Sequence, residues 1–198
     1  MNVEDSPEVS VLIHELGGML SSVQGFSHIA EANPGHPNRE RYIKLAASEA
    51  RRAAQTVKDI HLIRSFDRGG VPASPPPVAL TALLEAVSRE DAGAAVEPPG
   101  SEDVSVVVDP AKLKSLLARC IAAAVVPPSV RVVPGRVEIA IPLAPADELA
   151  RRTGALDAPY PDMIVFSLAR RLLRHWGGDL QLVAEGEWTT ATILLRRP

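Results

Sequence analysis

His14 is a residue whose type and position could support a reaction. It lies in the segment Leu12-Ile13-His14-Glu15-Leu16-Gly17-Gly18-Met19-Leu20. A neutral imidazole nitrogen can attack a phosphorus atom in line, provided that the nitrogen is exposed to solvent. Taken alone, however, a histidine on a helix is usually an ordinary surface residue, and the same holds for the adjacent Glu15. A role in phosphoryl transfer therefore depends on the elements that position this segment.

The apolar residues around His14 alternate at spacings of four and three, which predicts a helix with one narrow apolar seam. This first seam consists of Leu12, Leu16, Met19, Val23, Phe26 and Ala30. Pro7 suits the first turn of the helix, Ser6 is a suitable cap, and Asn33-Pro34-Gly35 ends it. His14 is at the heptad position furthest from the seam, so we expect its ring to point to solvent.

Small residues share the predicted face of His14 or adjoin it. They are Gly17, Gly18, Ser21, Ser22 and Gly25. A glycine inside a helix costs about 1 kcal/mol relative to alanine, so three of them suggest that another molecule or segment approaches closely. Either a partner protein or the C-terminal part of this chain could be that neighbour.

A second helix is expected to start near Asn38 and to fade by Arg68-Gly69-Gly70. Its apolar residues have the same alternating spacing: Ile43, Ala46, Ala50, Ala53, Val57 and Ile60. A hairpin with one seam per helix shelters little apolar surface, whereas two hairpins form a four-helix bundle. We therefore expect a homodimer, the alternative being that the seams pack on the C-terminal domain.

The chain is expected to have an α+β fold. In it the antiparallel hairpin is followed by a proline-rich linker and an α/β sandwich, with helices on one face of a mixed sheet. The expected domains are a helical hairpin over 1–68, a linker over 69–77 and the sandwich over 78–198. Helices are expected over 78–89, 110–125 and 163–176. Strands are expected over 104–108, 130–133, 137–141, 180–183 and 189–195.

The first helix resembles the phospho-acceptor helix of sensor histidine kinases. The match consists of His14-Glu15-Leu16, Leu20 and Gly25-Phe26, while Met19 stands where the family usually has proline. The resemblance implies that His14 accepts a phosphoryl group and that Glu15 is a general base or orients the ring. It also implies dimerisation through the hairpin and a response-regulator receiver docking on the small residues. Gly18 stands where dual-function kinases carry a threonine or asparagine for hydrolysis.

The order of elements from residue 78 resembles the ATP-binding domain of the same family, but its nucleotide-binding residues are replaced. Ala123 takes the place of the magnesium-binding asparagine and has no oxygen ligand. Leu143 or a neighbour takes the place of the adenine-reading aspartate. Met163 to Phe166 replace the glycine-rich phosphate loop, and Asp147 to Tyr160 are too few for the usual ATP lid. We expect no ATP and no bound metal, with magnesium supplied only by a partner receiver.

Composition excludes several other classes of protein. The formal net charge of -3 favours neither nucleic acid nor membrane as a partner, and a single cysteine, Cys120, forms no internal disulfide. The N-terminus lacks a signal-peptide pattern, and no apolar run approaches the roughly 20 residues that span a bilayer. These features are typical of a cytoplasmic protein.

The sequence thus predicts a dimeric histidine phosphotransferase built on a degenerate histidine-kinase body. It would relay a phosphoryl group through His14 between response-regulator receivers, with a hybrid histidine kinase as a further partner. One alternative is a non-catalytic pseudokinase module that binds a response regulator or a kinase. The other is an active kinase with a divergent nucleotide site.

Overall fold

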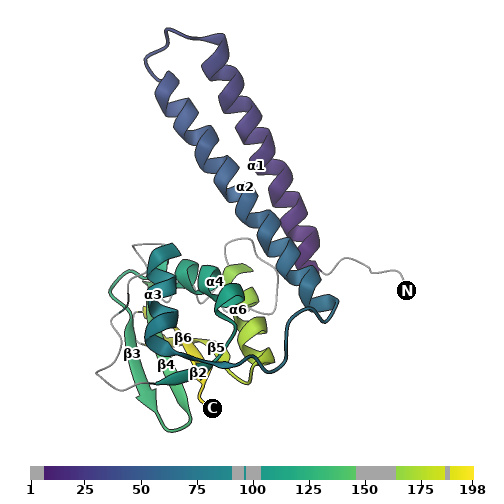
Figure 1. The fold of residues 1–198 in the computed structure, drawn as a ribbon. Coiled ribbons are helices and arrows are strands. Elements are labelled where there is room, and N and C mark those ends of the chain that lie inside the picture. Colours follow the sequence, from purple (N-terminus) through teal and green to yellow (C-terminus); the bar gives the residue numbers. More distant parts are fainter. Residues whose placement is uncertain (1–6, 91–95, 97–103, 146–163, 186–187) are drawn as a thin grey trace. The chain divides into compact units, whose positions relative to one another are not determined.

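The computed structural model describes residues 7–90, 96, 104–145, 164–185 and 188–198 (Figure 1). It divides into two compact units, residues 1–70 and 71–198. The first is a helical hairpin and the second is an α/β domain.

The hairpin consists of α1, Pro7–Ala32, and α2, Arg39–Asp67. The predicted first seam faces α2, with Leu12, Met19 and Ala30 buried. The Thr56 hydroxyl lies 3.8 Å from the Met19 sulfur, and the rings of Phe26 and Tyr42 stack 6.4 Å apart. These contacts fix the register of the two antiparallel helices.

The apolar residues of α2 lie on two faces of the helix, one packed on α1 and one exposed, whereas the sequence predicted a single seam. Ala46, Ala53 and Ile60 are buried in the hairpin. In contrast, Ile43 and Val57 are exposed, and so is Ala50, which lies seven residues from each. One set of heptad-spaced residues packs on α1, while the other lies on a flank of the hairpin.

The second unit contains three helices and six strands among its described residues. They are β1 (Pro77–Ala79), α3 (Leu80–Glu90), β2 (Ser105–Val107), α4 (Pro110–Ala122), β3 (Ser129–Val133), β4 (Arg136–Pro145), α6 (Ile164–His175), β5 (Asp179–Glu185) and β6 (Trp188–Arg196). One sheet has the order β3-β4-β6-β5, and β1 pairs with β2. All these pairs are antiparallel, so the described strands do not form the mixed sheet that was expected.

The helices α3, α4 and α6 lie on one face of the four-stranded sheet (Figure 1). The inward positions of β4 alternate along the strand as Val137, Ile139 and Ile141, all fully buried, because neighbouring residues of a strand point to opposite faces. These side chains pack against the helices and form part of the apolar core of the domain.

Two element boundaries differ from the sequence prediction for identifiable reasons. Residues Pro77–Ala79 pair with β2, so the helix expected from residue 78 begins at Leu80. The helix α4 begins at Pro110, where the Asp109 carboxylate caps the Ala111 amide at 2.9 Å. It ends at Ala122, because the backbone then turns away and the Val125 amide donates to the Pro142 carbonyl at 2.9 Å.

A glycine pair ends α6 and allows β5 to start close to β6. Gly177 has a φ of 79°, in the left-handed region that favours glycine. A Cβ atom on Gly178 would lie 2.2 Å from the Leu194 carbonyl oxygen. Next to this pair, the Trp176 indole donates to the Pro72 carbonyl at 2.9 Å, which ties the start of the second unit to α6.

Candidate functional site

The structure places His14 on the exposed side of α1. Two residues along a helix correspond to a rotation of about 200°, so His14 lies opposite Leu12 and the seam that contacts α2. The ring is therefore available to a partner without any opening of the hairpin. This is the geometry that an attacking imidazole nitrogen needs.

Glu15 is half-buried on the flank of α1 that leads towards α2. Burial raises the pKa of its carboxyl, while the positive charge of Arg52 and, more weakly, that of His14 act in the opposite direction. The carboxylate thus lies in the electrostatic field of a side chain from the other helix. The sequence prediction did not include Arg52, since its electrostatic effect on Glu15 depends on how the two helices pair.

The five predicted docking residues lie along the exposed side of α1 and its edge. Gly17, Gly18, Ser21 and Gly25 are exposed, and Ser22 is half-buried. The Ser21 hydroxyl donates to the Gly17 carbonyl at 3.0 Å, so it is directed to its own helix. No described atom lies within 4 Å of a Cβ atom added to any of the three glycines. Packing inside the hairpin therefore does not require them.

Alanine at these glycines should stabilise the hairpin. We expect Gly17→Ala and Gly25→Ala each to raise the free energy of unfolding by about 1 kcal/mol, because alanine loses less backbone entropy in a helix and meets no neighbour here. Urea titrations followed by circular dichroism would measure the change. A loss of stability would show that these glycines serve the fold itself.

In the second unit, Ala123, Leu143 and Phe166, which the resemblance aligns with nucleotide-binding positions, carry apolar side chains. Ala123, the C-cap residue of α4, is exposed, and its side chain is only a methyl group. Leu143 is 3% exposed and Phe166, in the first turn of α6, is 4% exposed, so both side chains belong to the core. Met163 and the short segment from Asp147 to Tyr160 lie outside the described residues.

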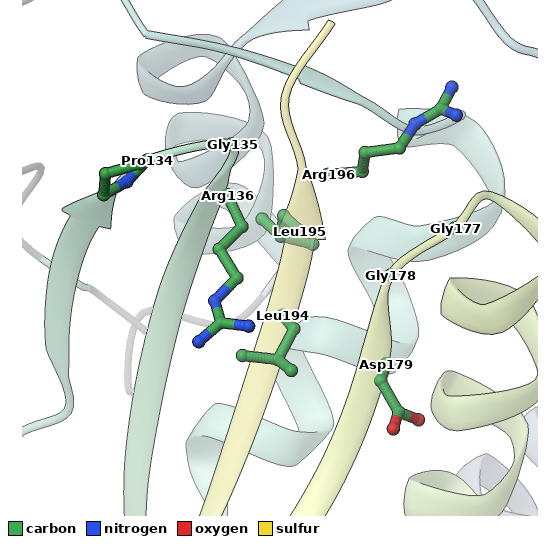
Figure 2. Close-up of a pocket in the computed structure, with 9 residues that line it drawn as sticks. All are labelled: Pro134, Gly135, Arg136, Gly177, Gly178, Asp179, Leu194, Leu195 and Arg196. Atoms are coloured by element: carbon green, nitrogen blue, oxygen red, sulfur yellow. The ribbon is translucent and has the colours of Figure 1, made fainter.

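A pocket of about 260 Å³ lies elsewhere in the second unit, at the turn between β3 and β4 (Figure 2). Its lining includes Arg136, Gly177, Asp179 and Leu194. Arg136 is paired with Glu138 at 2.9 Å, and Asp179 is paired with Arg174 at 2.8 Å. The pocket follows the C-terminal end of α6, whereas Phe166, which the resemblance aligns with the phosphate loop, lies near the N-terminal end. The lining of the pocket has no histidine, serine or cysteine, and its one carboxylate, Asp179, is held in the ion pair with Arg174.

The described part of the chain offers little for a metal or redox site. No group of three or more histidine, cysteine, aspartate or glutamate residues within it could hold a metal ion. Cys120 is fully buried, and this burial raises the pKa of its thiol to about 12, so the reactive thiolate is scarce at neutral pH. None of the helices in those residues combines the length and hydropathy needed to cross a membrane.

Comparison with solved structures shows which fold these units form. The Acinetobacter baumannii histidine kinase AdeS aligns over 93% of this chain and 98% of its own, with a TM-score of 0.64 and 16% identity. The fold is that of a histidine kinase. The histidine kinase ThkA, in a structure with the response regulator protein TrrA, aligns over 96% of this chain with a TM-score of 0.66 and 13% identity. This chain spans 60% of the ThkA chain.

The histidine-kinase fold confirms the predicted architecture of a helical hairpin followed by an α/β sandwich. No protein-family model matches the sequence, and no curated protein matches it well enough to count as a relative. The likeness therefore rests on the course of the backbone and assigns no role to any individual side chain.

Proposed function

We propose that this chain is a histidine phosphotransferase that relays a phosphoryl group between response-regulator receivers through His14. The observation that carries the proposal is the exposure of His14 on a kinase-like hairpin, in a chain that has Ala123, Leu143 and Phe166 at positions aligned with nucleotide-binding residues. An imidazole nitrogen forms a bond to phosphorus while the bond from phosphorus to the aspartate oxygen of the receiver breaks. Glu15 takes up or orients the proton of the ring.

The partner class follows from the fold and from the surface around His14. ThkA has the same fold and has been seen in complex with a response regulator protein. On this chain the exposed glycines leave the backbone of α1 open beside His14, which suits the close approach of a receiver. The receiver would bring its own acidic pocket and magnesium, so this chain needs neither a metal nor ATP.

Dimerisation is supported by a second exposed surface on the hairpin. Ile13 and Leu20, seven residues apart on α1, are 48% and 50% exposed. On α2, Ile43 and Val57 are 46% and 39% exposed, with exposed Ala50 between them. Each set lies about a quarter turn from the buried residues of its helix.

These two sets fall on the same side of the hairpin, because the helices are antiparallel and the quarter turns have the same sign. We call Ile13, Leu20, Ile43, Ala50 and Val57 the apolar flank. Heptad-spaced apolar residues on two neighbouring helices are the pattern that packs in a four-helix bundle. A second copy of the hairpin would bury this flank and leave both His14 residues accessible.

Whether ATP binds distinguishes a phosphotransferase from an active kinase. With Ala123, Leu143 and Phe166 at three positions that would contact nucleotide, ATP with magnesium should not bind at physiological concentration. Isothermal titration calorimetry would measure this directly, with an active histidine kinase as the positive control. Micromolar affinity for ATP would contradict the proposal and favour a kinase with a divergent site.

The direct test is transfer from phosphorylated receivers. A panel of receivers carrying radiolabelled aspartyl phosphate would be incubated with this protein and separated by electrophoresis. A cognate receiver should transfer to it a label that is stable to base and labile to acid, as a phosphoramidate on histidine is. If a receiver binds stably but transfers nothing, the chain is a non-catalytic module.

A further inference from the structure

The segment between the hairpin and β1 is held on the second unit, although its composition is that of a free linker. Residues 71–76, which we call the strap, include three prolines. Four of the six residues are exposed, and only Val71 and Pro75 are buried. Val71 is 4% exposed, so its side chain packs in the second unit. The strap is therefore attached to that unit at a few points.

The first two residues of the strap are bound to the C-terminal end of α6. The Trp176 indole nitrogen donates to the Pro72 carbonyl oxygen at 2.9 Å, and Nε2 of His175 lies 3.1 Å from the Val71 carbonyl oxygen. A carbonyl oxygen can only accept, so Nε2 carries the proton of the second bond. Trp176 is 2% exposed, which fixes its indole in the core. Two consecutive carbonyls are thus held by two consecutive side chains.

The end of α2 leaves no free residue before this anchor. Gly69 has a φ of 69°, and its amide donates to the Phe66 carbonyl at 2.9 Å. The Gly70 amide donates to the Ser65 carbonyl at 2.8 Å. These two bonds form a Schellman motif, which binds Gly70 to the end of the helix. The joint between the two units is therefore the single peptide bond from Gly70 to Val71.

The strap is held by far fewer contacts than the core of the second unit. Among the residues that the structure describes, no further backbone hydrogen bond joins Ala73, Ser74 or Pro76 to that unit. The prolines have no N–H group and can donate none. When released, a proline-rich segment stays extended at about 3 Å per residue, so residues 71–76 would form a tether of about 19 Å.

We propose that the strap is a latch that controls how independently the two units move. With the strap docked on α6, the units are joined by one peptide bond between two fixed ends. With the strap released, the same units are joined by an extended tether. A segment held by few contacts opens more readily than a core, so the strap can open while the second unit stays folded.

The test compares two valine-to-aspartate variants of the full chain. Val71→Asp puts a charge at the buried anchor of the strap, and Val126→Asp makes the same change at a valine that is 48% exposed in the same unit. A charge without a partner is unfavourable in apolar surroundings, so Val71→Asp should release the strap and Val126→Asp should not. Trp176→Phe is a second test variant, because it removes the indole N–H and keeps an aromatic ring.

Hydrogen exchange of the Trp176 indole proton is the first readout, because this proton is bound to the strap. NMR spectra of the wild type and of Trp176→Phe identify its signal. The proton should exchange several-fold faster in Val71→Asp than in the wild type or in Val126→Asp. The backbone amides of β4 and β6 should keep their wild-type protection, which would show an open strap on a folded unit.

Tumbling and proteolysis provide the second readout. NMR relaxation of the backbone amides should show that α2 and β6 tumble more independently in Val71→Asp and in Trp176→Phe than in the wild type, because the tether is longer. Elastase cleaves after small residues, and it should cut between Ala73 and Ser74 several-fold faster in both variants. Val126→Asp should behave as the wild type in both measurements.

Three results would overturn the latch. The first is a wild-type indole proton that exchanges as fast as that of Val71→Asp, since the strap would then not be bound. The second is a released strap that leaves the tumbling of the two units unchanged. Should Val71→Asp lose the protection of β4 and β6, Trp176→Phe decides, and wild-type tumbling in that variant is the third. None of these measurements needs a receiver or a phosphoryl donor, so the result is independent of the role of His14.

Discussion

His14→Ala should abolish the phosphoryl label on this protein while leaving its fold and its assembly intact. The side chain is exposed on α1, so its removal creates no cavity and leaves no buried group without a partner. The reaction, in contrast, loses its nucleophile, and the label should fall below the detection limit. Electrophoresis after incubation with a phosphorylated cognate receiver measures the label, and circular dichroism checks the fold.

A second class of variant separates recognition from chemistry. Gly25→Arg puts a long charged side chain on the face of the small residues and leaves His14 in place. We expect it to prevent receiver binding, whereas His14→Ala should still bind. Gly35→Arg is the matched control, since it makes the same change in the exposed loop between the helices, where an added Cβ also meets no atom within 4 Å.

Full transfer by His14→Ala, with every receiver that labels the wild type, would show that the acceptor assignment is wrong. If Gly25→Arg and Gly35→Arg weaken receiver binding equally, the receiver does not dock on the small residues. Both results can be read from the same pull-down and transfer reactions, so one set of receivers decides both points.

Introducing charged residues on the apolar flank should dissociate the dimer. We expect Leu20→Asp combined with Val57→Asp to convert a dimer, of twice 21.1 kDa, into a chain of 21.1 kDa. A carboxylate buried in the bundle without a partner costs several kcal/mol, more than a small helical interface can lose. Both residues are exposed in the single hairpin, so the separated chains should keep their helices. Sedimentation velocity measures the mass.

Ser48→Asp is the control for this experiment, because Ser48 is exposed on α2 away from the apolar flank. Val23 is less suitable as a test position, since it is half-buried towards α2 and a charge there would disturb the hairpin itself. A wild-type chain that sediments as a monomer at micromolar concentration would contradict the bundle. The expectation of a dimer would then have to be given up.

Much of the fold could be predicted from the sequence because its signals are local. The heptad spacing from Leu12 to Ala30 predicted α1 and its buried face. A strand was predicted over 137–141, and its alternate residues Val137, Ile139 and Ile141 are the buried ones in β4. That Ala123 and Phe166 stand for nucleotide-binding residues remains a prediction from the order of elements, which the calorimetric titration with ATP tests. The exposure of His14, in contrast, could be predicted, because it follows from its angle to the seam.

Other features depend on how the helices pair, which local spacing does not specify. The seam of α2 was expected to be continuous, but the register set by Met19 and Thr56 buries Ala46, Ala53 and Ile60 and leaves Val57 on the flank. The pairing of the helices also places Glu15 in the electrostatic field of Arg52, which lies 37 residues away in the sequence. The sequence by itself therefore determined the elements and the exposed histidine. Only the tertiary structure decided which side chains share a face. The packing between the two helices sets how each is rotated about its axis and how far it is displaced along the other.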